Sequence, residues 1–327
     1  MHGQIFVEAL TPERVLHPFP LVLIHGGAQT ANNWLTTPDG RQGWADWFVD
    51  QGWVVYLVDQ PARGRSAWQP GLDGPLVPIP VHHVERLFTA CAEYDDWPQG
   101  KLHTQWPGGE GKGHSGDPVF DQFYASQVPW MGRIETESAV SRAGAALLDR
   151  VGPAVVLVHS QAGAFGWLLA DARPELVKAI VAVEPFGPPF RDDSALKNVP
   201  DRSWGLTLTP LTYDPPVTAD HPLEFEQQRR VDPTLQAGWL QKGRPRRLAN
   251  LRNVPVLVAT GEASYHAAYD HCTVAYLVQA GVQVEHMRLA DRGVHGNGHM
   301  MMLELNSLEI AALLNAWLIR TLAGSDA

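Results

Sequence analysis

Three residues of this sequence are of types that, brought together, can catalyse acyl transfer, and each follows an apolar stretch or a glycine-rich loop. Ser160 follows residues 155–158, Glu184 follows residues 179–183, and His299 follows a loop of glycine and asparagine. A serine hydroxyl is almost fully protonated at neutral pH, so it attacks a carbonyl only when a base such as histidine takes its proton. A carboxylate orients that base and stabilises its charged form. The three residue types therefore predict nucleophilic catalysis by serine.

The surroundings of Ser160 predict a sharp turn from a strand into a helix. The β-branched stretch 155–158 is typical of a buried strand, and the small, apolar stretch 162–170 is typical of a buried helix. Such a turn presents the serine at the carboxyl end of a sheet and leaves the next backbone N–H free for an oxyanion. Val158 stands where the usual Gly-x-Ser-x-Gly signature has its first glycine. A serine that only caps the helix is the alternative interpretation.

A second loop predicts the rest of an oxyanion hole. His25-Gly26-Gly27 follows the apolar stretch 21–24. In α/β-hydrolases this loop supplies one of two backbone donors, so we expect the N–H groups of Gly27 and Gln161 to bind the oxyanion. The chain order serine, acid, histidine is the order that this fold imposes, and it differs from the orders in two unrelated protease folds.

The sequence offers two candidates for the acid, Glu184 and Glu262. The acid of this fold commonly lies three residues after the glycine that ends the next strand. Here that glycine is Gly261, and the expected position holds Ser264. We therefore favour Glu184, because a glutamate is one methylene longer and spans the greater distance from the preceding strand. A solvated carboxylate at a strand end is the alternative for Glu184.

Two histidines are candidates for the base. His299 follows two glycines and directly precedes an apolar helical pattern, whereas His295 lies four residues earlier and can bond within the loop or contact substrate. We favour His299. His159 flanks the serine, and we expect its side chain to point away from the site and pack. No metal and no organic cofactor are predicted.

These segments resemble the bacterial esterase 713 family of α/β-hydrolases. The resemblance implies ester chemistry, with Ser160 as nucleophile, Glu184 as an acid after the strand that precedes the usual one, and His299 as base. Gly27 and Ala28 stand where the founding esterase of that family has two adjacent cysteines, so a disulfide beside the oxyanion hole is not expected. The segments that carry the resemblance are residues 25–27, 37–44, 59–66, 159–163, 183–185 and 293–302.

Apolar stretches alternate with helical patterns along the chain, which predicts an α/β-hydrolase fold with a mostly parallel sheet and helices on both faces. The expected strands are 21–24, 54–58, 155–158, 180–183, 256–259 and 282–287, and the expected helices are 43–50, 138–149 and 303–318. We expect a single domain over residues 1–327.

Two long stretches, about 67–137 and 187–249, interrupt this alternation. Both are rich in proline, glycine and tryptophan. Tryptophan is too apolar to remain exposed in such numbers, so we expect these stretches to form a lid over the serine. A peripheral cluster that only shields an edge of the sheet is the alternative.

The composition excludes several functions. The 327 residues have a formal net charge of −10 and 45% hydrophobic content, without a long basic cluster or a run of about 20 apolar residues. We therefore expect no nucleic-acid or membrane partner. No signal peptide is visible, which predicts a cytoplasmic protein, or a periplasmic one if a leader was removed. Two distant cysteines, Cys91 and Cys272, are expected to be reduced.

The sequence therefore predicts an esterase or lactonase acting on a small-molecule substrate, and the tryptophans favour an apolar or aromatic one. Two alternatives stay open: a lyase or acyltransferase that uses the same residues, and a ligand-binding protein that kept the hydrolase fold without turnover. The sequence also leaves a homodimer open.

Overall fold

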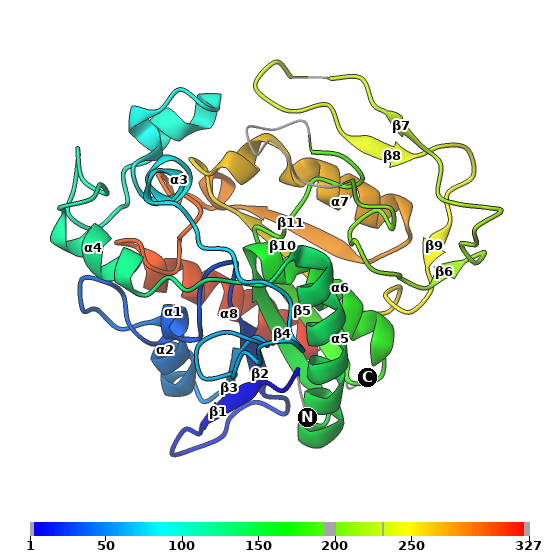
Figure 1. Cartoon of the computed structure of the whole chain (residues 1–327), viewed down its shortest axis with the longest axis horizontal. Coiled ribbons are helices and arrows are strands. Elements are labelled where there is room, and N and C mark those ends of the chain that lie inside the picture. Colours follow the sequence, from blue (N-terminus) through cyan, green and yellow to red (C-terminus); the bar gives the residue numbers. More distant parts are fainter. Residues whose placement is uncertain (1–2, 193–200, 231, 324–327) are drawn as a thin grey trace.

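A computed structural model of the chain describes residues 3–192, 201–230 and 232–323. Its centre is a seven-stranded sheet in which only the pair β1 and β3 is antiparallel (Figure 1). In spatial order the strands are β1 (Phe6–Leu10), β3 (Val55–Asp59), β2 (Leu21–Ile24), β4 (Ala154–His159), β5 (Val177–Val183), β10 (Val256–Thr260) and β11 (Val284–Arg288).

Helices cover both faces of this sheet because each central strand is apolar on both sides. Leu21 and Leu23 of β2 face one core, and Val22 and Ile24 face the other. The first core is closed by α2 (Trp44–Asp50) and α8 (Ser307–Ala323). The second is closed by α5 (Arg133–Val151), α6 (Gly163–Ala172) and much of α7 (Asp270–Gln279). This confirms the expected α/β-hydrolase fold.

The expected strands are all present, with ends that differ by up to three residues, but β1 was missed. Its residues are exposed or half-buried and make no continuous apolar run. The last helix also begins later than expected, at Ser307. The guanidinium of Arg41 donates to the backbone carbonyls of Leu303, Glu304 and Leu305, which diverts these residues from the helix.

The two long stretches have different local structures. The first contains α3 (Val81–Val84), a π-helical turn (Glu85–Thr89), two short 3₁₀ turns (Cys91–Glu93 and Pro98–Leu102) and α4 (Pro118–Ala125). The second contains two small antiparallel sheets: β6 (Tyr213–Asp214) pairs with β9 (Arg247–Leu248), and β7 (Phe225–Gln227) pairs with β8 (Trp239–Gln241), beside α7 in Figure 1.

The remaining short elements are α1 (Asn32–Leu35) and 3₁₀ turns at Ser160–Ala162, Tyr265–Ala268 and Leu289–Arg292. Among the described residues, no helix is long and apolar enough to span a membrane.

Leu314 and Ile319 of α8 test how much the first core stabilises the fold. Leu314 is fully buried, whereas Ile319 is 48% exposed. We expect Leu314→Ala to lower the free energy of unfolding by about 2–5 kcal/mol, because it removes buried methyl groups and leaves a cavity. Ile319→Ala on the same helix should change it by about 0.5 kcal/mol or less. Urea denaturation measures both values, and equal losses would contradict the packing described.

Candidate active site

Ser160 lies at the tight turn between β4 and α6, as predicted. Its φ angle is +55°, a left-handed conformation that is costly for a residue with a side chain and that recurs at functional sites. Gly163 makes the turn possible, because a Cβ atom there would overlap Pro185. The Ser160 carbonyl also accepts a 2.8 Å hydrogen bond from the backbone N–H of Phe186. The turn is thus held from two sides.

Glu184 and His299 form a short buried hydrogen bond, although 115 positions separate them in the sequence. His299 Nδ1 lies 2.6 Å from Glu184 Oε2, and both side chains are inaccessible to solvent. Glu184 also has a positive φ angle, +45°. Its carboxylate accepts two further hydrogen bonds, from the backbone N–H of Gly261 at 2.8 Å and from Ser264 Oγ at 2.6 Å. Ser264, at the position where this fold commonly has its acid, therefore donates to the Glu184 carboxylate instead.

The alternative candidates, Glu262 for the acid and His295 for the base, bond to each other instead of joining Glu184 and His299. His295 Nδ1 lies 3.1 Å from Glu262 Oε1, and the imidazole is largely exposed. Glu262 also accepts from the backbone N–H of Gly296 at 2.9 Å. Neither residue lines the cavity that Ser160 and His299 share.

Burial sets the charges of the Glu184–His299 pair. Loss of solvent, followed by repulsion from His159 and His266, lowers the pKa of His299 well below its ordinary value. Burial also raises the pKa of Glu184, against the hydrogen bonds from Ser264 and Gly261. Three donors around one carboxyl group favour its ionised form. These hydrogen bonds oppose the effect of burial on Glu184, and the neutral imidazole of His299 lies within hydrogen-bonding distance of the same carboxyl group.

The other nitrogen of His299 faces the cavity but is not bonded to the serine. Tyr265 Oη lies 3.3 Å from His299 Nε2. Ser160 lines the same cavity, yet the described structure contains no hydrogen bond between Ser160 and His299. In free enzymes such contacts are often long and shorten when substrate binds.

A second histidine–acid pair lies directly against the first, and sequence reasoning missed it. The rings of His266 and His299 are parallel within 7°, with centroids 4.8 Å apart. His266 Nδ1 bonds Asp270 at 2.8 Å, and its Nε2 bonds Tyr269 at 3.0 Å. The four-residue spacing of His266 and Asp270 was the available signal. Burial lowers the pKa of His266 to about 4, so this ring is neutral at pH 7.

Glu184, His266 and His299 are also close enough together to be considered as metal ligands. Both nitrogens of His266 already have protein partners, and the Glu184 carboxylate has three. We assign no metal to this cluster.

Glu304 holds the loop that carries His299. Its carboxylate accepts from Asn297 Nδ2 at 2.7 Å and from the backbone N–H of Gly298 at 2.9 Å. His103, from the first long stretch, lies 2.7 Å from the same carboxylate. Although burial opposes it, hydrogen bonds to Cys91 and Glu304 raise the pKa of His103 to about 10, so the contact is an ion pair at neutral pH.

His159 packs against this loop, but the expectation that its side chain points away from the site is wrong, because its ring contacts that of His299. Its Nε2 lies 3.0 Å from the backbone carbonyl oxygen of His299, and the two rings are 4.5 Å apart. Burial lowers the pKa of His159 to about 3, so the ring is neutral and can donate to that carbonyl.

The two expected oxyanion loops meet beside Ser160. A Cβ atom on Gly26 would come within 3.0 Å of Ser160 Cβ, and one on Gly27 would overlap the Trp130 ring. The buried guanidinium of Arg63 joins the two loops: it donates to the carbonyl of Gly26 at 2.9 Å and to Oε1 of Gln161 at 2.7 Å.

Asp59, at the end of β3, holds the backbone next to these two loops in place. It accepts from the backbone N–H of Ala31 at 2.7 Å and from Arg65 at 2.8 Å.

A cavity of about 180 Å³ contains the serine and the histidine. Its wall is mostly apolar and aromatic, and much of it comes from the first long stretch. None of residues 201–230 or 232–249 lines it. The lining residues are Gly27, Gln29, Val77, Pro78, Ile79, Pro80, His83, Leu87, Phe88, Trp130, Arg133, Ser160, Gln161, Phe186, Tyr265 and His299.

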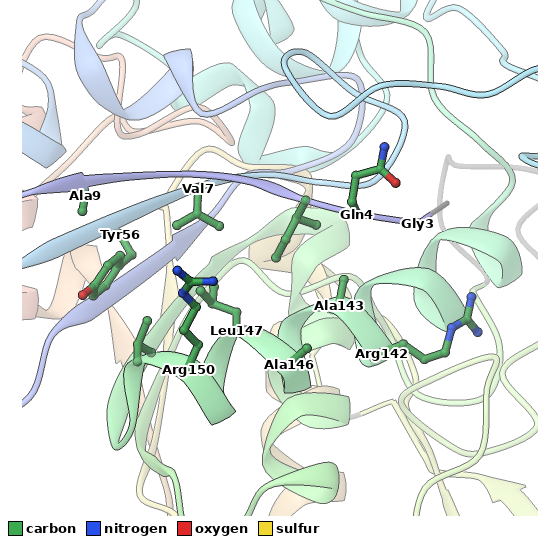
Figure 2. A pocket seen from close by; sticks show the side chains of 12 residues that line it. Gly3, Gln4, Val7, Ala9, Tyr56, Arg142, Ala143, Ala146, Leu147 and Arg150 are labelled. Atoms are coloured by element: carbon green, nitrogen blue, oxygen red, sulfur yellow. The ribbon is translucent and has the colours of Figure 1, made fainter. Parts of the chain in front are cut away.

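A larger hollow of about 850 Å³ lies elsewhere, between β1 and α5 (Figure 2). Tyr56, Arg142 and Arg150 line it, and it contains none of the residues predicted to be catalytic. Size alone therefore does not locate the chemistry.

Comparison with known proteins supports an ester hydrolase. No family model matches the chain. The probable secreted lipase phiG of a fungal species is 47% identical over 318 residues, which cover 96% of this chain and 85% of the lipase. The structure of a bacterial esterase is 24% identical, with a TM-score of 0.65 over 98% of this chain and 86% of that chain. A monoacylglycerol lipase from Paleococcus ferrophilus, at 13% identity and a TM-score of 0.45 over 97% and 99% of the chains, is too remote to add to the argument.

The fungal relative corrects one expectation. The sequence predicted a cytoplasmic protein, but this 47% identical relative is named a probable secreted lipase. That finding contradicts the expected cytoplasmic location. Its identity over nearly the whole chain, with the fold shared with the bacterial esterase, establishes the family. The chain therefore belongs to the esterase-like family of α/β-hydrolases, a family of carboxylic ester hydrolases.

Proposed function

We propose that the chain is a serine hydrolase that cleaves a carboxylic ester or lactone through an acyl-enzyme on Ser160. The observation that supports this most directly is the 2.6 Å bond between Glu184 and His299, because His299 also lines the cavity of Ser160. In this proposal His299 is the base and Glu184 is the acid that orients it. The backbone N–H groups of Gly27 and Gln161 form the oxyanion hole.

The proposed reaction has two halves. Ser160 Oγ attacks the carbonyl carbon while His299 Nε2 takes its proton, and the backbone donors stabilise the oxyanion. His299 then gives this proton to the leaving alkoxide, and the acyl group stays on the serine. A water molecule, deprotonated by His299, attacks the acyl-enzyme. Collapse of this second intermediate releases the acid and returns the proton to the serine.

The first long stretch, about 67–137, is the proposed lid. It supplies the cavity wall from Val77 to Phe88 as well as Trp130 and Arg133. The ion pair of His103 with Glu304 ties it to the catalytic loop. The second stretch contacts α7 through β8. None of its described residues lines the cavity.

Neutralising each of the two candidate carboxylates in turn tests which of them is the acid. On a series of p-nitrophenyl esters, Ser160→Ala should lower kcat by about 10,000-fold or more, because it removes the nucleophile. Glu184→Gln should lower kcat by roughly 1,000- to 10,000-fold, because the amide cannot stabilise the imidazolium. Glu262→Gln is the matched control and should stay within about twofold of the wild type. A larger loss in Glu262→Gln than in Glu184→Gln would reverse the assignment of the acid.

The burial of His299 predicts activity at unusually low pH. The base must be neutral to take the serine proton, and burial lowers the pKa of His299 below its ordinary 6.5. The neutral fraction therefore persists as the pH falls, and kcat/KM should decline only below pH 6.5. A pH profile of kcat/KM measures this. A half-maximal value at or above pH 6.5 would contradict the described environment.

Arg63 is predicted to position the oxyanion hole. Arg63→Met removes both hydrogen bonds between the two loops and should lower kcat by roughly 10- to 100-fold, with a smaller change in KM. Arg173→Met is the control, because Arg173 pairs with Asp149 at the surface and bonds neither loop. An effect of Arg63→Met on KM alone would show that Arg63 acts in ground-state binding instead.

A further inference from the structure

Three arginines gather around the cavity without a carboxylate partner. Arg63 and Arg202 are fully buried, and Arg133, at the start of α5, lines the cavity itself. Within the described residues, none of the three makes an ion pair or a hydrogen bond with an aspartate or glutamate. A buried cation is normally neutralised by a paired acid, because removing it from water is costly. Here the cations cluster in a chain whose net charge is −10.

Two of these arginines donate to neutral groups through their terminal nitrogens, although the Nε atom of each is buried without a described partner. Arg63 donates to the Gly26 carbonyl and the Gln161 side chain. Arg202 donates to the backbone carbonyls of Pro188 at 2.7 Å and Gly187 at 2.9 Å. These bonds hold the two side chains in place but do not neutralise their charges.

Arg133 differs from these two arginines, because the described contacts of its guanidinium are with aromatic rings. Its guanidinium carbon lies 4.0 Å from the centre of the Phe186 ring and 5.8 Å from that of Trp130. The same two rings also carry Arg202, at 4.2 Å from Phe186, and Arg63, at 5.3 Å from Trp130. The rings hold Arg133 in place at the cavity wall, and among the described residues its side chain has no hydrogen-bond acceptor.

Two acids, Asp192 and Glu137, attract Arg133 electrostatically. Glu137 is occupied by hydrogen bonds from Leu208 and Thr209, each at 2.9 Å.

The histidines on the cavity wall do not compete with Arg133 for an anion. Burial, followed by nearby cations, lowers the pKa of His83, and burial lowers that of His299. Arg133 is thus the permanent charge on the described wall.

We propose that the substrate is a small ester that also carries a free carboxylate, and that Arg133 binds this carboxylate while Ser160 attacks the ester. The planar guanidinium matches a carboxylate with two parallel hydrogen bonds. The volume of about 180 Å³ favours a compact substrate, with its apolar part against the aromatic wall. This inference rests on the function proposed above and names the substrate class for the same site.

Matched pairs of charged and neutral esters test this. The pairs are 4-acetoxybenzoate with its methyl ester, and monomethyl glutarate with dimethyl glutarate, so that the carboxylate lies on the alcohol side or the acyl side. We expect wild-type kcat/KM to favour the charged member of at least one pair by about tenfold or more. Arg133→Met should lower this ratio by about tenfold, and Arg133→Lys should restore part of it.

The charged-to-neutral ratio separates recognition from folding, since a poorly folded variant loses both activities together. Arg142→Met is the control on the same helix, because Arg142 lies in the distant hollow of Figure 2, and it should keep the wild-type ratio. Equal ratios in the wild type and Arg133→Met would overturn the inference. If Ser160→Ala also retained hydrolysis, the proposed function itself would fail; if Ser160→Ala were inactive, only the substrate class would be wrong.

Discussion

The buried hydrogen bond between Glu184 and His299 is the interaction on which the rest of the site depends. Two ionisable groups without access to water are tolerated only if their lone pairs and protons are matched. Much of the surrounding structure provides this matching. Gly261 and Ser264 donate to the carboxylate, and the neutral His266 ring covers one face of the imidazole. Each supporting group comes from the carboxyl edge of the sheet, where the parallel strands end together.

Further layers of polar contacts hold the backbone around this bond. Glu304 accepts a hydrogen bond from the loop that carries His299, and His159 contacts the backbone carbonyl of His299. Arg63 joins the two loops of the proposed oxyanion hole. Such second contacts matter because a displacement of about 1 Å at reacting groups can cost roughly 100-fold in rate. The site is therefore a property of several loops held at fixed distances.

The arginines add an electrostatic character that the overall charge conceals. The chain is acidic, yet Arg63, Arg133 and Arg202 lie against the aromatic rings of the cavity wall, without bonded carboxylates among the described residues. Aromatic rings between them allow this, since each ring face attracts a guanidinium. A field of this sign would also favour the anions that form along an acyl-transfer reaction.

The sequence by itself determined the fold class and the position of the serine, because apolar strands and a small-residue turn are local patterns. It also placed Glu184 and His299 at strand and loop ends, where a parallel sheet brings residues together. It could not reveal β1, which is half-exposed and lacks a continuous apolar run, or the later start of α8, which depends on Arg41. The pairing of Glu262 with His295, the ring of His266 against His299 and the isolation of Arg133 were decided by the tertiary structure alone. These features depend on which side chains meet across long separations, and spacing along the chain does not contain that information.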